Sequence, residues 1–156
     1  MVLLHGLASN CHIWDLVAPM LAPYFKVYAL DQRGHGETES PNTGYGFDTI
    51  TRDLQAFLGI LGVDRPLLVG HSWGGNVALH YAASRPSSLS GLTLVDGGTI
   101  EISRMPGMTS DRAQIALAPP DFTGMTRDIL LQRAQERDVV NLWSPEVEAA
   151  FLANFH

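Results

Sequence analysis

The stretch that decides the fold of this chain is Leu67-Leu68-Val69-Gly70-His71-Ser72-Trp73-Gly74-Gly75-Asn76. Apolar residues lead into a Gly-x-Ser-x-Gly pattern, and a helix-forming segment follows directly. This order of strand, tight turn and helix is typical of a nucleophile elbow. Such a turn lifts the serine out of both neighbouring elements, and the flanking glycines remove Cβ atoms that would collide. The pattern therefore predicts that Ser72 is an exposed nucleophile for acyl transfer or a related hydrolysis.

Composition limits the class of protein. The 156 residues are enough for one domain with a core, and the 46% of hydrophobic residues exclude a disordered chain. The net charge of −6 is spread evenly without a basic stripe, so nucleic acid is not expected as a partner. No apolar run has the length of a membrane span or signal peptide, which predicts no membrane partner and a cytoplasmic location. Cys11 is the only cysteine, which excludes an internal disulfide.

Strand-like and helix-like segments alternate over the first 98 residues. Helical patterns are expected over residues 14–22, over a segment capped by Asp48 or Thr49 that extends to Leu61, and over residues 73–85. The apolar runs are mostly continuous, as in a parallel sheet covered on both faces. They predict an α/β fold with a central, mostly parallel sheet and helices on both faces. The predicted strands are residues 2–5, 26–31, 66–71 and 91–96.

The pattern changes after Gly97-Gly98. No further strand is evident, and short amphipathic helices are expected over residues 110–117, 126–139 and 145–155, the last with Ser144 as its N-cap. We expect residues 1–98 to form a core domain and residues 99–156 to form a helical cap or lid segment that is cut short. Helices that simply cover the core are the alternative.

Two further motifs accompany the elbow. His5-Gly6-Leu7 follows the first predicted strand, and Asp31-Gln32-Arg33-Gly34-His35-Gly36-Glu37 follows the second. With these motifs in this order and spacing, residues 2–98 closely resemble strands 3 to 6 of the α/β-hydrolase fold family. The resemblance implies an esterase-like or lipase-like serine hydrolase that cleaves a small ester or related carbonyl substrate through an acyl-enzyme at Ser72. It implies a small-molecule substrate and neither a metal nor a cofactor, and it leaves the oligomeric state open.

The resemblance also assigns site residues. The oxyanion hole would consist of the backbone N–H groups of Leu7 and Trp73, each contributing ~3 kcal/mol to transition-state stabilisation. Gly6 would let its loop approach the substrate, and His12 could contact it. The motif at residues 31–37 is expected to support the nucleophile loops rather than to act as an acid–base cluster.

The sequence does not show which residue would act as the general base for Ser72. In the family a histidine beyond the last strand activates the serine, and a carboxylate orients that histidine. Asp96 is a candidate for the acid, although a loop-capping role is the alternative. No suitable base is found among the histidines, which are His5, His12, His35, His71, His80 and His156.

We therefore expect an incomplete family member that has little turnover by itself. The alternative function is a non-catalytic receptor that binds a small ligand on the same fold. A nucleotide-binding Rossmann protein is disfavoured, because the glycines lack the Gly-x-Gly-x-x-Gly spacing.

Overall fold

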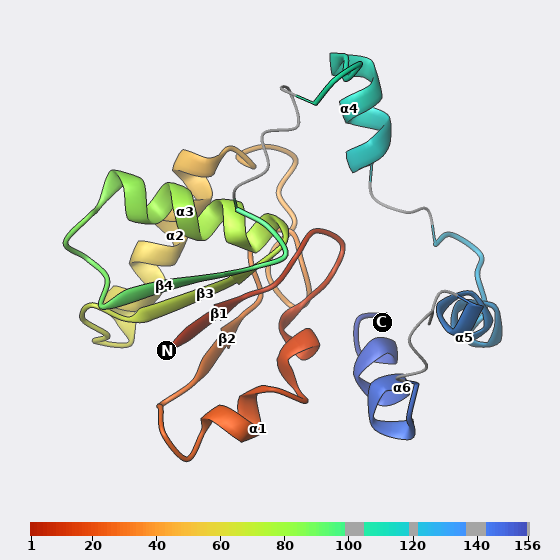
Figure 1. Ribbon diagram of the computed structural model, residues 1–156, viewed down its shortest axis with the longest axis horizontal. Coiled ribbons are helices and arrows are strands. Elements are labelled where there is room, and N and C mark those ends of the chain that lie inside the picture. The colour runs from red at the N-terminus through yellow and green to blue at the C-terminus, as the bar shows by residue number, and fades with distance from the viewer. Residues whose placement is uncertain (99–104, 119–121, 137–142, 156) are drawn as a thin grey trace.

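A four-stranded parallel sheet forms the centre of the protein. The computed structural model describes residues 1–98, 105–118, 122–136 and 143–155. The strand order is β2-β1-β3-β4, and every neighbouring pair is parallel (Figure 1). The predicted α/β class is thus confirmed, and all four predicted strands form with slightly shorter bounds. They are β1 (Val2–Leu4), β2 (Tyr28–Leu30), β3 (Leu67–His71) and β4 (Gly91–Val95).

The position of β1 brings the three sequence motifs together. Val2 pairs with Tyr28 of β2 on one side and with Leu68 of β3 on the other. Since parallel strands point the same way, the turns that follow β1, β2 and β3 all leave the same edge of the sheet. Ligands of open α/β sheets bind at this edge.

Two helices cover one face of the sheet. The helices α2 (Phe47–Ile60) and α3 (Trp73–Ser84) pack there together (Figure 1). Alternate side chains of a strand point to opposite faces, so every second residue of the strands faces these helices. The resulting core consists of Val2, Leu4, Ile50, Leu54, Leu58, Leu68, Val77, Ala78 and Tyr81.

The opposite face carries shorter elements. A 3-10 turn, η1 (Cys11–Trp14), contacts β1 and β2, and the Trp14 ring lies edge-on to His71 with centroids 6.5 Å apart. A four-residue helix, α1 (Ala18–Leu21), follows η1. The prediction of one helix over residues 14–22 was wrong. Pro19 lacks an N–H group and is accommodated in the first turn of α1, so a helix cannot run through it from Trp14.

The start of α2 also differs from the prediction. Gly46, not Asp48 or Thr49, is the N-cap residue, and it adopts an extended conformation before Phe47. Asp48 lies in the first helical turn, where its carboxylate accepts a hydrogen bond from the His80 ring on α3. The Asp48 side chain, which the sequence pattern assigned to the helix cap, therefore binds His80 instead.

Beyond the sheet, the described residues form three further helices. They are α4 (Ser110–Leu117), α5 (Arg127–Glu136) and α6 (Pro145–Leu152). Ser144 caps α6 as predicted, because its side chain accepts from the Val147 N–H group. Residues 137–139 of the predicted second helix lie outside the described residues. No helix in the described ranges is long and apolar enough to cross a membrane.

The helical face of the sheet should dominate stability. Leu54 is 1% exposed in the core of α2, whereas Ile60 at the end of the same helix is 86% exposed. We expect Leu54→Ala to lower the free energy of unfolding by about 2–5 kcal/mol, because it removes packed methyl groups and leaves a cavity. Ile60→Ala, the matched control, should change it by less than about 0.5 kcal/mol. Urea denaturation of both variants measures the difference, and equal losses would contradict this account of the core.

Candidate active site

Ser72 occupies a sharp turn between β3 and α3. Its backbone has φ 50° and ψ −118°, in the left-handed region that residues with a Cβ rarely adopt. Hydrogen bonds hold the turn on both sides. The Ser72 N–H donates to the Val95 carbonyl at 2.9 Å, and the Ser72 carbonyl accepts from the Gly75 N–H at 2.9 Å. A strained residue held this firmly is what the predicted elbow requires.

The elbow lies directly against the end of β1. A Cβ placed on Gly74 would come within 2.6 Å of the Leu4 carbonyl oxygen and would also collide with the carbonyl of His5. A Cβ on Gly6 would lie 3.2 Å from the Ser72 Cβ and 3.0 Å from His71 Nδ1. The loop that begins at Gly6 therefore touches the serine, and glycine is needed where the two backbones meet.

The two predicted oxyanion donors flank this contact. Trp73 is the first residue of α3, so its N–H has no acceptor within the helix and lies at the positive end of the helix dipole. Leu7 follows Gly6 in the loop that touches Ser72. In the described part of the chain, no other group accepts a hydrogen bond from either N–H. This placement supports the prediction of Leu7 and Trp73 as donors.

His5 fixes the orientation of the Gly6-Leu7 loop. The ring is fully buried, its Nδ1 donates to the Gly6 carbonyl at 2.7 Å, and its Nε2 accepts from the Gln32 N–H at 3.0 Å. The C=O and N–H groups of a trans peptide point in opposite directions. Because His5 holds the Gly6 oxygen on one side, the Leu7 N–H points to the other. The sequence indicated a structural role for His5 but not its link to Gln32.

Burial keeps this histidine neutral. Desolvation lowers the pKa of His5 to about 4, although its hydrogen bond to Gly6 opposes that shift. Both ring nitrogens are already used by the neutral form, so a second ring proton would displace the Gln32 N–H. His5 is therefore an anchor of the loop and not a general base at neutral pH.

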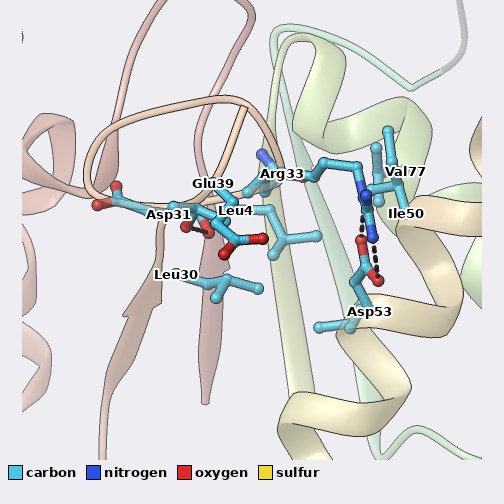
Figure 2. A pocket seen from close by; sticks show the side chains of 11 residues that line it. Leu4, Leu30, Asp31, Arg33, Glu39, Ile50, Asp53 and Val77 are labelled. Carbon is cyan, nitrogen blue, oxygen red and sulfur yellow. Dashed lines mark hydrogen bonds and ion pairs between the residues drawn. The ribbon is translucent and has the colours of Figure 1, made fainter. Parts of the chain in front are cut away.

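The motif at residues 31–37 serves as a support. The Asp31 carboxylate accepts from the N–H groups of Cys11 at 2.7 Å and Glu37 at 3.1 Å. Burial raises the pKa of Asp31, but these hydrogen bonds outweigh burial and keep the pKa below its ordinary value. Arg33 binds Asp53 on α2 through two hydrogen bonds of 2.6 and 2.9 Å (Figure 2). These contacts favour the structural interpretation of the motif over an acid–base role.

His35 connects the same motif to the elbow. Its ring centroid lies 4.9 Å from that of His5 and 5.6 Å from that of Trp73. The His35 ring also engages the Arg33 carbonyl through Nδ1 at 3.0 Å. Side chains from all three motifs thus pack against one another next to the elbow.

The described residues do not supply a base for Ser72. Histidine–carboxylate pairs form between His12 and Asp15 at 2.8 Å and between His80 and Asp48 at 3.1 Å. Neither pair includes Ser72, whose hydroxyl has no hydrogen-bond partner within the described ranges. His156 lies outside the described residues.

Asp96 and His12 have no demonstrated role in the site. Asp96 follows β4 with φ 48°, and its exposed side chain forms no hydrogen bond or ion pair among the described residues. His12 lies in η1, after the oxyanion loop, with its ring on Asp15. Asp96 as the acid and His12 as a substrate contact stay predictions.

The end of α6 contacts the segment that follows the Gly6-Leu7 loop. The Asn154 Oδ1 atom accepts from Ser9 Oγ at 2.8 Å and from the Asn10 N–H at 3.1 Å. The Asn10 side chain donates in return to the Ala153 carbonyl at 3.0 Å. Between η1 and α6 lies a cavity of about 230 Å³ lined by Ile13, Leu16, Val147, Ala150, Phe151 and Asn154. The sequence did not indicate this connection, which spans some 145 residues.

Comparison with known proteins decides the family. A family model described as the alpha/beta hydrolase fold matches residues 1–142. The chain belongs to the α/β-hydrolase fold family. A soluble epoxide hydrolase from Corynebacterium sp. (strain C12) is 38% identical over 96 residues, which cover 62% of this chain and 34% of that protein. The N-formylmaleamate deformylase of Pseudomonas putida is 40% identical over 97 residues, with 62% and 36% covered.

The structural comparison extends over almost the whole of this α/β-hydrolase chain. A probable hydrolytic enzyme from Pseudomonas aeruginosa PAO1 superposes with a TM-score of 0.73 at 25% identity, covering 98% of this chain and 49% of that one. The chain spans about a third of the length of the curated relatives it matches. These relatives are hydrolases that act on different bonds.

The buried His5 should make stability depend on pH. Its pKa is about 4 in the folded protein against an ordinary 6.5, so below pH 6.5 the unfolded chain takes up the proton first. The free energy of unfolding should therefore fall by up to about 3 kcal/mol between pH 6.5 and 4, and this contribution should end below pH 4. Urea denaturation across this range measures the slope.

Two controls isolate the contribution of His5. The slope between pH 4 and 6.5 should decrease in His5→Gln and persist in His80→Gln, because the His80 ring is partly exposed. Where His5→Gln does not fold, an NMR titration of the His5 ring protons gives the pKa directly. A midpoint near 6.5 would contradict the neutral anchor.

Proposed function

We propose that this chain carries the nucleophile and the oxyanion hole of a serine hydrolase for a small ester or related carbonyl substrate. The observation that carries the proposal is the left-handed Ser72 held against the Gly6-Leu7 loop. Ser72 Oγ would attack the carbonyl carbon while its proton passes to a general base. The carbonyl oxygen would become an oxyanion between the N–H groups of Leu7 and Trp73. The alcohol would leave, and water would then release the acyl group from Ser72.

The relatives are named for different bonds, and the geometry of the site favours a carbonyl group among them. The relatives are named for an epoxide and for an N-formyl group, so family membership alone leaves the bond open. A hydroxyl nucleophile beside two N–H donors suits a carbonyl, because the charge that develops in the transition state is on oxygen. The mostly apolar cavity between η1 and α6 supports residues 99–156 as a cap over a small organic substrate.

The described residues do not provide a general base to accept the proton of Ser72. A serine hydroxyl is a weak nucleophile until a base takes its proton. Since no histidine forms a hydrogen bond with the Ser72 hydroxyl in the described ranges, we infer that the 156-residue chain alone turns over slowly. Asp96 is the proposed acid by its position directly after β4, because Val95 of β4 pairs with His71, the residue before Ser72.

Covalent labelling tests the nucleophile on the chain itself. A fluorophosphonate probe should modify Ser72 slowly, and imidazole added as an external base should accelerate the reaction. Ser72→Ala should abolish labelling, while Ser84→Ala, at the far end of α3, should retain it. Mass spectrometry of the intact protein and of its peptides measures the rate and the site. A folded protein that is not labelled at any imidazole concentration would overturn the proposal and favour the small-ligand receptor.

A proline substitution tests the oxyanion hole. Leu7→Pro removes the backbone N–H, whereas Leu7→Ala retains it and shortens only a side chain that is partly exposed. We expect Leu7→Pro to slow imidazole-assisted labelling about 100-fold and Leu7→Ala to slow it less than about threefold. Circular dichroism of both variants verifies folding. Equal rates in the two folded variants would exclude the Leu7 N–H as a donor.

A further inference from the structure

Asn154 joins the end of α6 to a segment near the start of the chain. Its Oδ1 atom accepts hydrogen bonds from Ser9 Oγ at 2.8 Å and from the Asn10 N–H at 3.1 Å. Its Nδ2 atom donates to the Ala150 and Phe151 carbonyls in the last turn of α6, at 2.9 and 3.3 Å. A single side chain therefore holds the last turn of α6 and residues 9 and 10 together.

Asn10 completes this contact from the other side. It is only 3% exposed, and its Nδ2 atom donates to the Ala153 carbonyl at 3.0 Å. The Asn10 Oδ1 atom accepts from the His12 N–H at 3.0 Å and so caps η1. Turning over either the Asn10 or the Asn154 amide would bring a side-chain N–H group against a backbone N–H group. The contact is therefore specific in direction as well as in place.

Ala8, directly before Ser9, adopts a strained backbone conformation. Its φ is 55°, in the left-handed region that residues with a Cβ rarely adopt. Both Leu7 and Ala8 are exposed, so burial in the core does not hold this conformation. A strained residue persists only where the structure around it fixes the neighbouring residues. The contacts on either side of Leu7 and Ala8 must therefore hold it.

The loop is held at both ends by different parts of the fold. At its start, the buried His5 ring binds the carbonyl of the next residue at 2.7 Å, which sets the direction of the N–H group that follows. At its end, the Cys11 N–H donates to the Asp31 carboxylate at 2.7 Å. The bonds to Asn154 reach the loop earlier, at residues 9 and 10. Asn154 therefore acts closest to the strained residue on that side.

We propose that Asn154 is a positioning residue for the oxyanion hole. The inference rests on the proposed function, in which the Leu7 N–H is a donor to the oxyanion. The Asn154 contact holds Ala8 in its left-handed conformation and so keeps the loop close to Ser72. Without the contact Ala8 is free to relax, and the Leu7 N–H then occupies its position beside Ser72 for only part of the time. A segment outside the sheet thus controls the reactivity of the serine without supplying a catalytic group.

Imidazole-assisted labelling of Ser72 by the fluorophosphonate probe tests this role. Asn154→Ala should slow labelling about 10-fold, because a donor that is held less closely stabilises the oxyanion less. Asn42→Ala is the matched control, since Asn42 is exposed and forms no hydrogen bond in the part of the chain that the structure describes. Its rate should equal that of the unchanged chain. Circular dichroism verifies folding, and equal rates for the two folded variants would overturn the proposal.

The Leu7→Pro background separates an effect through the donor from a general loss of structure. This variant has no N–H at residue 7, so adding Asn154→Ala should slow its labelling by less than about twofold. The same loss of about 10-fold in both backgrounds would overturn the proposal, because Asn154 would then act on something other than the Leu7 N–H.

Ser9→Ala gives a milder version of the test. It deletes the hydroxyl that donates to Asn154 and leaves the asparagine in place. Labelling should slow about threefold, and adding Ser9→Ala to Asn154→Ala should cause no further loss, because both changes remove one contact. Additive losses would contradict the proposal. Where Asn154→Ala does not fold, Ser9→Ala with and without Leu7→Pro replaces it.

NMR relaxation separates the failure of this inference from the failure of the proposed function. The ¹⁵N heteronuclear NOE values of Leu7 and Ala8 report picosecond-to-nanosecond motion of the loop. They should fall in Asn154→Ala and stay unchanged in Asn42→Ala, whether or not Ser72 reacts. Lower values in a chain whose serine is never labelled would confirm the hold of Asn154 on the loop and overturn the proposed function. Unchanged values in Asn154→Ala would overturn the positioning role.

Discussion

The contact between the Gly74 backbone and the end of β1 is the constraint on which the site depends. The elbow packs so closely there that a Cβ would overlap the carbonyl groups of Leu4 and His5. Gly74 does not have a positive φ, so glycine is required for space and not for conformation. Any side chain at this point would push α3 away from β1. Ser72 and the Gly6-Leu7 loop would then separate, although every strand of the sheet could still pair.

A second set of contacts orients the Gly6-Leu7 loop next to Ser72. His5 holds the Gly6 carbonyl, Gln32 holds His5, and the ring of His35 lies between His5 and Trp73. The proposed oxyanion donors are backbone N–H groups, so their directions are set by peptide planes and cannot be adjusted by side-chain rotation. A buried, hydrogen-bonded histidine is a rigid way of fixing such a plane. Donors fixed in advance stabilise a developing oxyanion without reorganising during the reaction.

The sequence predicted those parts of the structure that local chemistry determines. The four strands, α3 and the Ser144 cap formed as expected, since apolar runs, Gly-x-Ser-x-Gly and capping residues act within a few positions. The helix expected over residues 14–22 does not form as one piece, because Pro19 fits only the first turn of α1. The Asn154 contact with Ser9 and the Gln32 contact with His5 could not be predicted. Each joins residues far apart in sequence, and nothing in the neighbouring residues specifies the partner.

Positioning the serine and accepting its proton depend on different kinds of residue. The elbow and its proposed donors are backbone features, encoded by glycines and strand order. A base is one side chain that only tertiary structure brings to the serine. In the described ranges, His12 and His80 pair with carboxylates elsewhere, and His5 is held neutral by burial. An oxyanion hole and substrate binding alone retain about 10³–10⁴-fold catalysis over water when a triad is removed. If Leu7 and Trp73 are the donors, the scaffold proposed here would therefore keep part of its effect without a base. Relatives named for an epoxide and for a formyl group both match this part of the fold, so the parts that choose the bond are expected to lie in side chains around it.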